Sequence, residues 1–199
     1  MPDVYCFEGV IWNRFEDQCV IVTEAGSGFG EATEKRFASE KANVVVSDVE
    51  AASAAKVCDE IQKAGGKAIS VTCDVSVEAD MEDLVDKAIG EFGAVDVMVN
   101  NAGYSHMSRL LWKISVEEFD AVFAVNVRGV FLGCKHVIPR MIERKKGVIV
   151  NIASVGAIAP RAGVTPYNGT KGAVLTIDRK STRLNPSHNQ VSYPVLCLK

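Results

Sequence analysis

Short, continuously apolar runs alternate with segments of helical periodicity along this chain of 199 residues. Five of the runs are rich in β-branched residues, which is typical of parallel strands that are covered on both faces. We therefore expect strands over 19–23, 43–47, 68–72, 95–99 and 147–153.

Apolar positions between these runs recur at the spacing of amphipathic helices. One such segment covers 81–92 and is followed by Gly93, a typical C-cap. A capping-box sequence over 115–118 predicts the start of another helix, whose apolar face continues through Val137. A third helix is expected over 51–63, before a pair of glycines.

The alternation of strands and helices predicts right-handed crossovers and a doubly wound parallel sheet. The fold class is therefore α/β, with three layers in the order helix, sheet, helix. We expect the strand order 3-2-1-4-5, with the functional side chains along the carboxyl edge of the sheet.

Composition narrows the class of protein further. Hydrophobic residues make up 48% of the chain and charged residues 24%, as in globular proteins, and the net charge of −3 argues against a nucleic-acid partner. We see no apolar run of roughly 18 residues and no signal peptide, so we expect no membrane association and a cytoplasmic protein. The six cysteines lack the spacing of a disulfide framework or a metal site, and no metal is expected.

A glycine-rich turn over 23–30 follows the first strand and precedes a helix. Glycines in this position let the backbone approach a pyrophosphate at a helix N-terminus, although such a sequence can also be a simple turn. Asp48, at the end of the second strand, follows Gly30 by 18 residues. Its carboxylate can accept hydrogen bonds from a ribose and repels a 2′-phosphate, which favours NAD over NADP; the alternative is a solvated acid at a strand end.

These motifs resemble those of the short-chain dehydrogenase/reductase family over about residues 12–177. The family sequence Thr-Gly-x-x-x-Gly-x-Gly is matched by Thr23, Gly28 and Gly30, and its Asp-Val and Asn-Asn-Ala-Gly motifs are matched at 74–75 and 100–103. The resemblance implies a Rossmann-type domain that uses NAD(P). The implied cofactor residues are Thr23, Ser27, Gly28, Phe29, Gly30, Asp48, Asp74, Val75, Asn101, Ala102, Gly103, Tyr167 and Lys171.

Tyr167 and Lys171 are spaced to share one helix face, where the ammonium group favours the phenolate form. A pair with this spacing also occurs by chance. Ser154, thirteen residues before the tyrosine, and Asn126 match the other two catalytic positions of the family. The resemblance implies that Tyr167 is the general acid or base, that Ser154 holds the substrate oxygen, and that Asn126 holds a water linked to Lys171. The substrate is then a small alcohol or its carbonyl.

One position departs from the family motif. Glu24 stands where the family has glycine, so it adds a negative charge beside an anionic cofactor and a Cβ in a tight turn. Functional divergence and a single-base change explain the departure equally well, and both predict weaker cofactor binding.

Two further expectations concern the aromatic residues and the loop after the fourth strand. The loop over 104–112 follows that strand at the expected cleft mouth, so it is a candidate lining of the substrate site. Trp112, Phe119 and Phe123 are expected in the core rather than in the site.

The resemblance stops near Ile177. Family members continue with a sixth strand, a loop that holds the nicotinamide, a substrate-covering helical region and a seventh strand. The sequence from Asp178 instead resembles the translation of a sequencing adapter, so we expect an incomplete domain over 1–177 and a non-native tail over 178–199. A divergent natural terminus is the alternative. Without the further elements, strand five becomes an exposed edge and part of the sheet face is uncovered.

Three functions remain open at this point. The first is that the full-length parent protein is an NAD(P)-dependent oxidoreductase that forms homo-oligomers, as the resemblance implies. In that case we expect this 199-residue chain itself to be inactive. The second is a nucleotide-binding module without catalysis. The third is a structural or interaction role, which depends on the tail being genuine.

Overall fold

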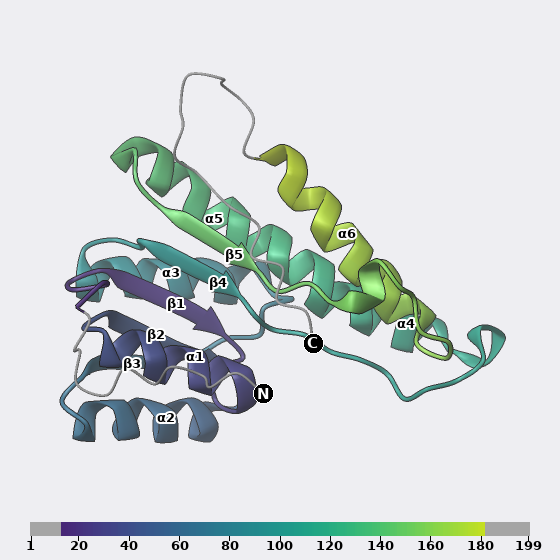
Figure 1. Cartoon of the computed structure of the whole chain (residues 1–199), viewed down its shortest axis with the longest axis horizontal. Coiled ribbons are helices and arrows are strands. Elements are labelled where there is room, and N and C mark those ends of the chain that lie inside the picture. Colours follow the sequence, from purple (N-terminus) through teal and green to yellow (C-terminus); the bar gives the residue numbers. More distant parts are fainter. Residues whose placement is uncertain (1–12, 182–199) are drawn as a thin grey trace, which may run out of the picture.

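The computed structural model describes residues 13–181, which form a parallel sheet between two layers of helices (Figure 1). The strand order is β3-β2-β1-β4-β5, as predicted. The strands are β1 (Cys19–Thr23), β2 (Asn43–Asp48), β3 (Lys67–Thr72), β4 (Val97–Asn100) and β5 (Val148–Asn151).

Strand β4 begins at Val97 rather than at position 95, and the side chain of the preceding residue, Asp96, connects several segments. The Asp96 carboxylate accepts a hydrogen bond from the Cys19 backbone N–H at 3.0 Å and pairs with Arg144 at 3.0 Å and Lys146 at 3.2 Å. The backbone hydrogen bond and the two cations outweigh the effect of burial and lower the pKa of Asp96. One buried acid therefore joins the start of β1 to the end of the helix that precedes β5.

Two helices cover one face of the sheet and the others lie on the opposite face (Figure 1). The first layer consists of α1 (Gly28–Ser39) and α2 (Ala51–Lys63). The second layer contains α3 (Glu78–Phe92), α4 (Val116–Phe123), α5 (Gly129–Arg144) and α6 (Thr165–Ser181). Two 3₁₀ turns, η1 (Leu111–Lys113) and η3 (Val155–Ala157), lie in the connections after β4 and β5.

The helix that starts at the capping box is not continuous. Ser115 and Glu118 form the predicted capping box, and α4 then ends at Phe123. The π-helical turn η2 (Ala124–Arg128) separates α4 from α5. The expectation of one α-helix through Val137 is therefore wrong, since a π turn contains one residue more than an α turn and shifts the phase of everything after it.

The combined segment Val116–Arg144 is long and apolar enough to span a membrane, in contrast to the expectation from the sequence. Its apolar residues have another explanation in the fold. Val130, Leu132, Val137 and Met141 are buried in the core cluster between the sheet and this helical layer. The composition of this segment is accordingly that of a core helix.

Trp112 is 75% exposed and Phe119 is 42% exposed, so the prediction that they belong to the core is wrong. Trp112 lies in the 3₁₀ turn η1, which contributes no buried residue. Phe119 stacks on Phe123 at 4.4 Å between ring centroids. The four cysteines in the described part of the chain are buried, and none of them forms a disulfide there.

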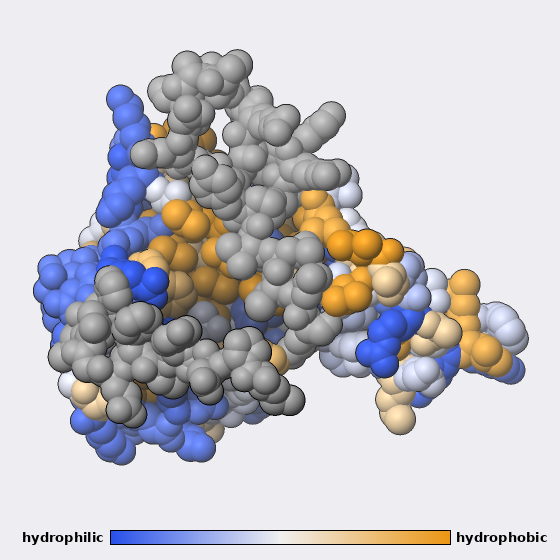
Figure 2. Space-filling model, in the orientation of Figure 1, coloured by the Kyte–Doolittle hydropathy of each residue, from blue (hydrophilic) through white to orange (hydrophobic). Residues whose placement is uncertain are grey.

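The sheet face opposite α5 is only partly covered by the described helices. Helices α1 and α2 pack over β1, β2 and β3, whereas Figure 2 shows a hydrophobic area over β4 and β5. In this area Val148 is 44% exposed, and Val150 and Ile152 are partly buried. Strand β5 also forms one edge of the described sheet. The predicted tail over 178–199 falls almost entirely outside the described residues and stays a prediction, although α6 continues to Ser181.

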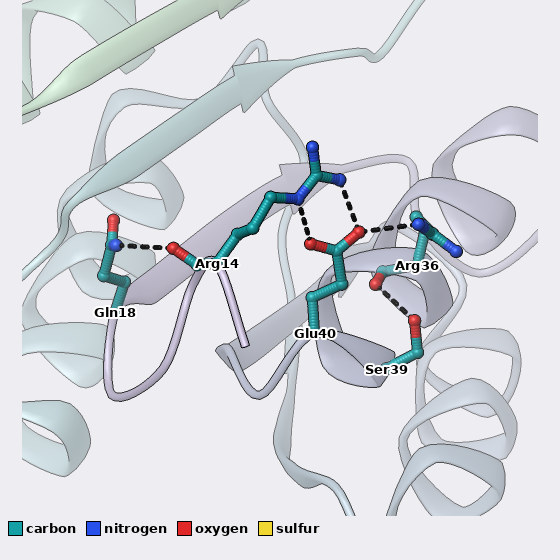
Figure 3. Close-up of polar contacts among 5 residues, drawn as sticks. All are labelled: Arg14, Gln18, Arg36, Ser39 and Glu40. Atoms are coloured by element: carbon teal, nitrogen blue, oxygen red, sulfur yellow. Dashed lines mark hydrogen bonds and ion pairs between the residues drawn. The ribbon is translucent and has the colours of Figure 1, made fainter. Parts of the chain in front are cut away.

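Helix α1 ends at an ion-pair cluster around Glu40, which is shown in Figure 3. The guanidinium of Arg14 contacts both carboxylate oxygens of Glu40 at 2.5 Å, and Arg36 adds a contact at 2.8 Å. The hydrogen bonds from Arg14, followed by the charges of both arginines, lower the pKa of Glu40. The cluster ties the segment before β1 to the end of α1.

A second glutamate of α1 has the opposite environment. The side chain of Glu34 is fully buried, and its Oε1 accepts a hydrogen bond from the Val22 N–H at 3.1 Å. Its Oε2 has no hydrogen-bond partner among residues 13–181. Burial raises the pKa of Glu34 well above its usual range, which favours the neutral acid in the folded protein.

We expect Glu34→Gln to stabilise the protein at pH 7. The raised pKa means that the carboxyl costs nothing below the unfolded-state pKa of about 4.5 and costs progressively more stability as the pH rises toward the folded-state value. A neutral amide has no proton to lose and avoids this pH-dependent cost, which grows by about 1.4 kcal/mol per pH unit between the unfolded-state and folded-state pKa values. Urea unfolding from pH 4 to pH 8 should show a gain at pH 7 that disappears near pH 4; an equal gain at both pH values would contradict the assignment.

Glu40→Gln should have the opposite effect and serves as the matched comparison in the same helix. Because the pKa of Glu40 is lowered, its contribution is present above the unfolded-state pKa and is lost as the pH falls through the folded-state pKa. The same urea series should show a loss of stability at pH 7 that closes toward acid pH. A variant as stable as the parent at pH 7 would show that the pair with Arg14 contributes nothing.

Candidate active site

The glycine-rich turn connects β1 to α1 and opens the site. Gly28 has a φ of +57°, in the left-handed region that favours glycine. At Gly30 a Cβ would lie 2.1 Å from the carbonyl oxygen of Glu24, so no other residue fits without moving the backbone. The spacing of Gly28 and Gly30, which was visible in the sequence, thus corresponds to two separate steric requirements.

Thr23 and Asn101 join this turn to the end of β4. The Thr23 hydroxyl accepts hydrogen bonds from the backbone N–H groups of Asn101 and Ala102, both at 3.0 Å. The Asn101 side chain donates in return to the carbonyl oxygens of Thr23 at 2.8 Å and Glu24 at 3.2 Å. The ends of two neighbouring strands are therefore fixed to each other by four hydrogen bonds.

Asp48 is buried at the end of β2 and holds the turn from the other side. Its Oδ2 accepts a hydrogen bond from the Gly26 N–H, and its Oδ1 accepts one from the Glu50 N–H, both at 2.9 Å. The carboxylate is thus oriented by backbone donors at the carboxyl edge of the sheet. Each oxygen retains a further lone pair for a hydroxyl donor.

Asp74 and Val75 shape the turn after β3. The Oδ1 of Asp74 accepts hydrogen bonds from the backbone N–H of Ser76 at 2.9 Å and from its hydroxyl at 2.7 Å. A Cβ on Gly129 would lie 2.9 Å from Cγ2 of Val75, so the start of α5 packs closely on this turn. This part of the predicted cofactor set is therefore closely packed against the start of α5.

Tyr167 and Lys171 occupy one face of α6, as predicted, and line a cavity of about 250 Å³. The Lys171 Nζ lies 5.9 Å from the centre of the Tyr167 ring and donates to the carbonyl oxygen of Ile152 at 2.8 Å. Lys171 is only 3% exposed. Ser154 lies just beyond β5, and its Oγ accepts a hydrogen bond from the Gly156 N–H at 3.1 Å. An amine, a phenol and a hydroxyl thus lie close to the end of one strand and on the helix after it.

Asn126 is fully buried in the π-helical turn, with its polar atoms engaged by the protein itself. Its Oδ1 accepts from the Tyr104 N–H at 2.7 Å, and its Nδ2 donates to the Tyr104 carbonyl oxygen at 2.9 Å and to the Thr170 hydroxyl at 3.0 Å. Thr170 in turn donates to the carbonyl oxygen of Tyr167 at 2.7 Å. Asn126 therefore positions both the loop after β4 and the helix that carries Tyr167.

The cavity brings together eight of the predicted site residues from the turn, the end of β4 and α6. They are Ser27, Gly28, Phe29, Gly30, Asn101, Gly103, Tyr167 and Lys171. The other seven predicted site residues do not line the cavity: Thr23, Asp48, Asp74, Val75, Ala102, Asn126 and Ser154. The sequence did not identify the lining residues Thr33, Ile152 and Ala153 or the positioning residue Thr170. For Ile152, Ala153 and Thr170 the one available signal was that they lie close in sequence to Ser154 or Tyr167.

The chain is similar in sequence to known dehydrogenases. The sequence model of the family described as short chain dehydrogenase matches residues 18–192, past the expected domain boundary at 177. A 4-formylbenzenesulfonate dehydrogenase of Comamonas testosteroni is 37% identical over 81% of the chain and 64% of its own length. A 2-(R)-hydroxypropyl-CoM dehydrogenase of Xanthobacter autotrophicus is 41% identical over 80% of the chain and 65% of its own length.

Solved structures are similar in fold and sequence. A 3-ketoacyl-(acyl-carrier-protein) reductase from Brucella melitensis, complexed with NADH, has a TM-score of 0.79 and 42% identity over 82% of this chain and 68% of that one. A 7α-hydroxysteroid dehydrogenase, complexed with NADH and a 7-oxo bile acid, has a TM-score of 0.81 and 35% identity over 85% of this chain and 66% of that one. The chain spans a little under two thirds of the length of these curated relatives.

Proposed function

The chain belongs to the short-chain dehydrogenase family of oxidoreductases, and from this membership we propose that its site binds NAD and, in the full-length protein, interconverts a secondary alcohol and its carbonyl. One observation carries the proposal. Tyr167 and Lys171 line the same cavity as the glycine-rich turn, so an acid–base pair and a phosphate-binding backbone face one small space.

The residues present fit a dinucleotide in most respects. The missing Cβ at Gly30 and the start of α1 provide close backbone approach and a site suited to anions. Asp48 is positioned to accept hydrogen bonds from an adenosine ribose, with Asp74, Val75 and Asn101 flanking it along the sheet edge. Tyr167 and Lys171 are placed to hold the nicotinamide ribose. When bound, the nicotinamide supplies the acceptor or donor of a hydride.

In this proposal the chain's own residues orient the substrate and move one proton. Ser154 holds the substrate oxygen by a hydrogen bond. Tyr167 removes the hydroxyl proton of an alcohol or donates a proton to a carbonyl oxygen. Asn126 keeps α6 and the loop after β4 in place through Thr170 and Tyr104.

An exposed apolar groove bears on how the protein assembles. Phe131 is 52% exposed and lines an open groove of about 760 Å³ between α4, α5 and α6. This apolar surface supports the proposal that the parent protein forms homo-oligomers. We further propose a cytoplasmic protein that acts on small molecules, without a nucleic-acid or membrane partner.

A nucleotide-binding module without catalysis is the second candidate. It is favoured by Glu24 in the cofactor turn and by the limited length over which the relatives match. Nucleotide binding is common to both candidates, whereas turnover that depends on Tyr167 belongs to the first alone.

We expect the chain to bind NADH at least about tenfold more tightly than NADPH, because Asp48 repels a 2′-phosphate. Asp48→Ala should narrow this preference, and fluorescence titration of both nucleotides measures it. Since Asp48 also accepts the Gly26 N–H, Asp48→Asn is the matched control: it removes the charge and keeps one acceptor. Tighter binding of NADPH by the parent chain would contradict the assignment of NAD.

We expect the 199-residue polypeptide to show little or no turnover of NAD with a panel of secondary alcohols, and Tyr167→Phe to be indistinguishable from it. The resemblance places the elements that hold the nicotinamide and cover the substrate after the catalytic helix, and misplacement of the reacting groups costs on the order of a hundredfold. NADH absorbance measures the rate. A clear rate that Tyr167→Phe abolishes would contradict the expected inactivity and would favour the enzyme over the binding module.

A further inference from the structure

The backbone at Glu24 adopts a conformation that favours glycine. Its φ is +54°, in the left-handed region. Its carbonyl oxygen accepts a hydrogen bond from the Asn101 side chain and packs against Gly30, and the next N–H donates to the Ser47 carbonyl oxygen at 2.8 Å. The surrounding structure thus fixes this backbone, and with it the direction in which the glutamate side chain leaves the turn.

The Glu24 side chain crosses from the glycine-rich turn to the end of β4. Its Oε2 accepts a hydrogen bond from the Gly103 N–H at 2.7 Å. Both residues line the cavity of about 250 Å³ that also contains Ser27, Tyr167 and Lys171. The carboxylate therefore lies within the space that the proposed cofactor has to enter.

The chemistry of this contact matters for the ligand. Backbone N–H groups in such a cavity, together with the start of α1, attract an anion. A carboxylate is itself an anion, and its hydrogen bond to the Gly103 N–H group is charge-assisted and solvent-exposed. Glu24 therefore occupies one donor of the cavity and adds a negative charge that repels a phosphate.

We propose that Glu24 is an internal competitor for the nucleotide phosphates, held on Gly103 until a ligand displaces it. The inference rests on the proposed nucleotide site and adds its selectivity: phosphorylated nucleotides are disfavoured, whereas a neutral nucleoside meets much less opposition. Glu24 is in this sense a specificity-determining residue, whereas a glycine at the same position has no side chain that could act in this way.

The test compares ADP with adenosine as probes, because neither needs the elements that would hold a nicotinamide. Isothermal titration of the 199-residue chain is repeated with Glu24→Gly and Glu24→Gln, each shown to be folded by circular dichroism. Glu82→Gln is the control, since it removes one exposed negative charge on α3 away from the cavity.

Glu24→Gly should bind ADP about 10- to 100-fold more tightly than the parent, the effect of one charge-assisted hydrogen bond. Glu24→Gln should lie in between, because its amide oxygen still accepts from Gly103 but carries no charge. The affinity of the Glu24 variants for adenosine should differ from that of the parent by less than about twofold. The affinity of Glu82→Gln for ADP should also stay within about twofold of the parent, as expected for a charge effect confined to the cavity.

Other results would overturn the proposal in distinguishable ways. Equal ADP affinity in the parent and in Glu24→Gly would reject the competitor and leave the nucleotide site intact. Failure of every folded variant to bind ADP would reject both. An equal gain for ADP and adenosine would mean that side-chain bulk, and not charge, is what matters.

A second measurement needs no nucleotide. In the parent the Gly103 amide hydrogen should exchange slowly with solvent, because Glu24 accepts it, and Glu24→Gly should accelerate its exchange at least about tenfold relative to amides of β1. Amide exchange by nuclear magnetic resonance measures this for Gly103 alone. Unchanged exchange in the variant would show that the contact does not persist in solution and would reject the proposal.

Discussion

The hydrogen bonds between Thr23 and Asn101 are the constraint on which the site depends. The strand order reverses at β1, which lies between β2 and β4. The connections that follow β1 and β4 therefore lead to opposite faces of the sheet and diverge at this point. The Thr23 hydroxyl and the Asn101 amide close that divergence over four hydrogen bonds. The glycine-rich turn, the loop after β4 and the cavity between them all take their positions from this junction.

Much of the framework was predictable because it follows from local patterns. The continuously apolar runs predicted β1 with its correct bounds, and the helical periodicity predicted α2 and the C-cap at Gly93. The spacing of Tyr167 and Lys171 placed them on one helix face, since residues i and i+4 share a face. These features need only near neighbours in the sequence.

The features that the sequence did not reveal depend on contacts between distant segments. The contacts of the Asp96 side chain with Cys19 and Arg144, next to the start of β4, are not visible in a strand pattern. The π turn around Asn126 has no pattern of its own, and the neutral state of Glu34 depends on packing between α1 and β1. The sequence marked Glu24 as unusual, but only the fixed turn determines that its carboxylate reaches Gly103.

The π turn also limits how this chain can vary in length. An α-helix advances by about 100° per residue, so the extra residue in η2 sets the rotational phase of α5 relative to α4. Deletion of one residue within 124–128 would restore a regular helix and rotate the side chains of one part by about that angle relative to the other. Either the buried face of α5 would turn away from the sheet, or Asn126 would leave Tyr104 and Thr170. Natural variants should therefore tolerate substitutions in this turn more readily than a change in its number of residues.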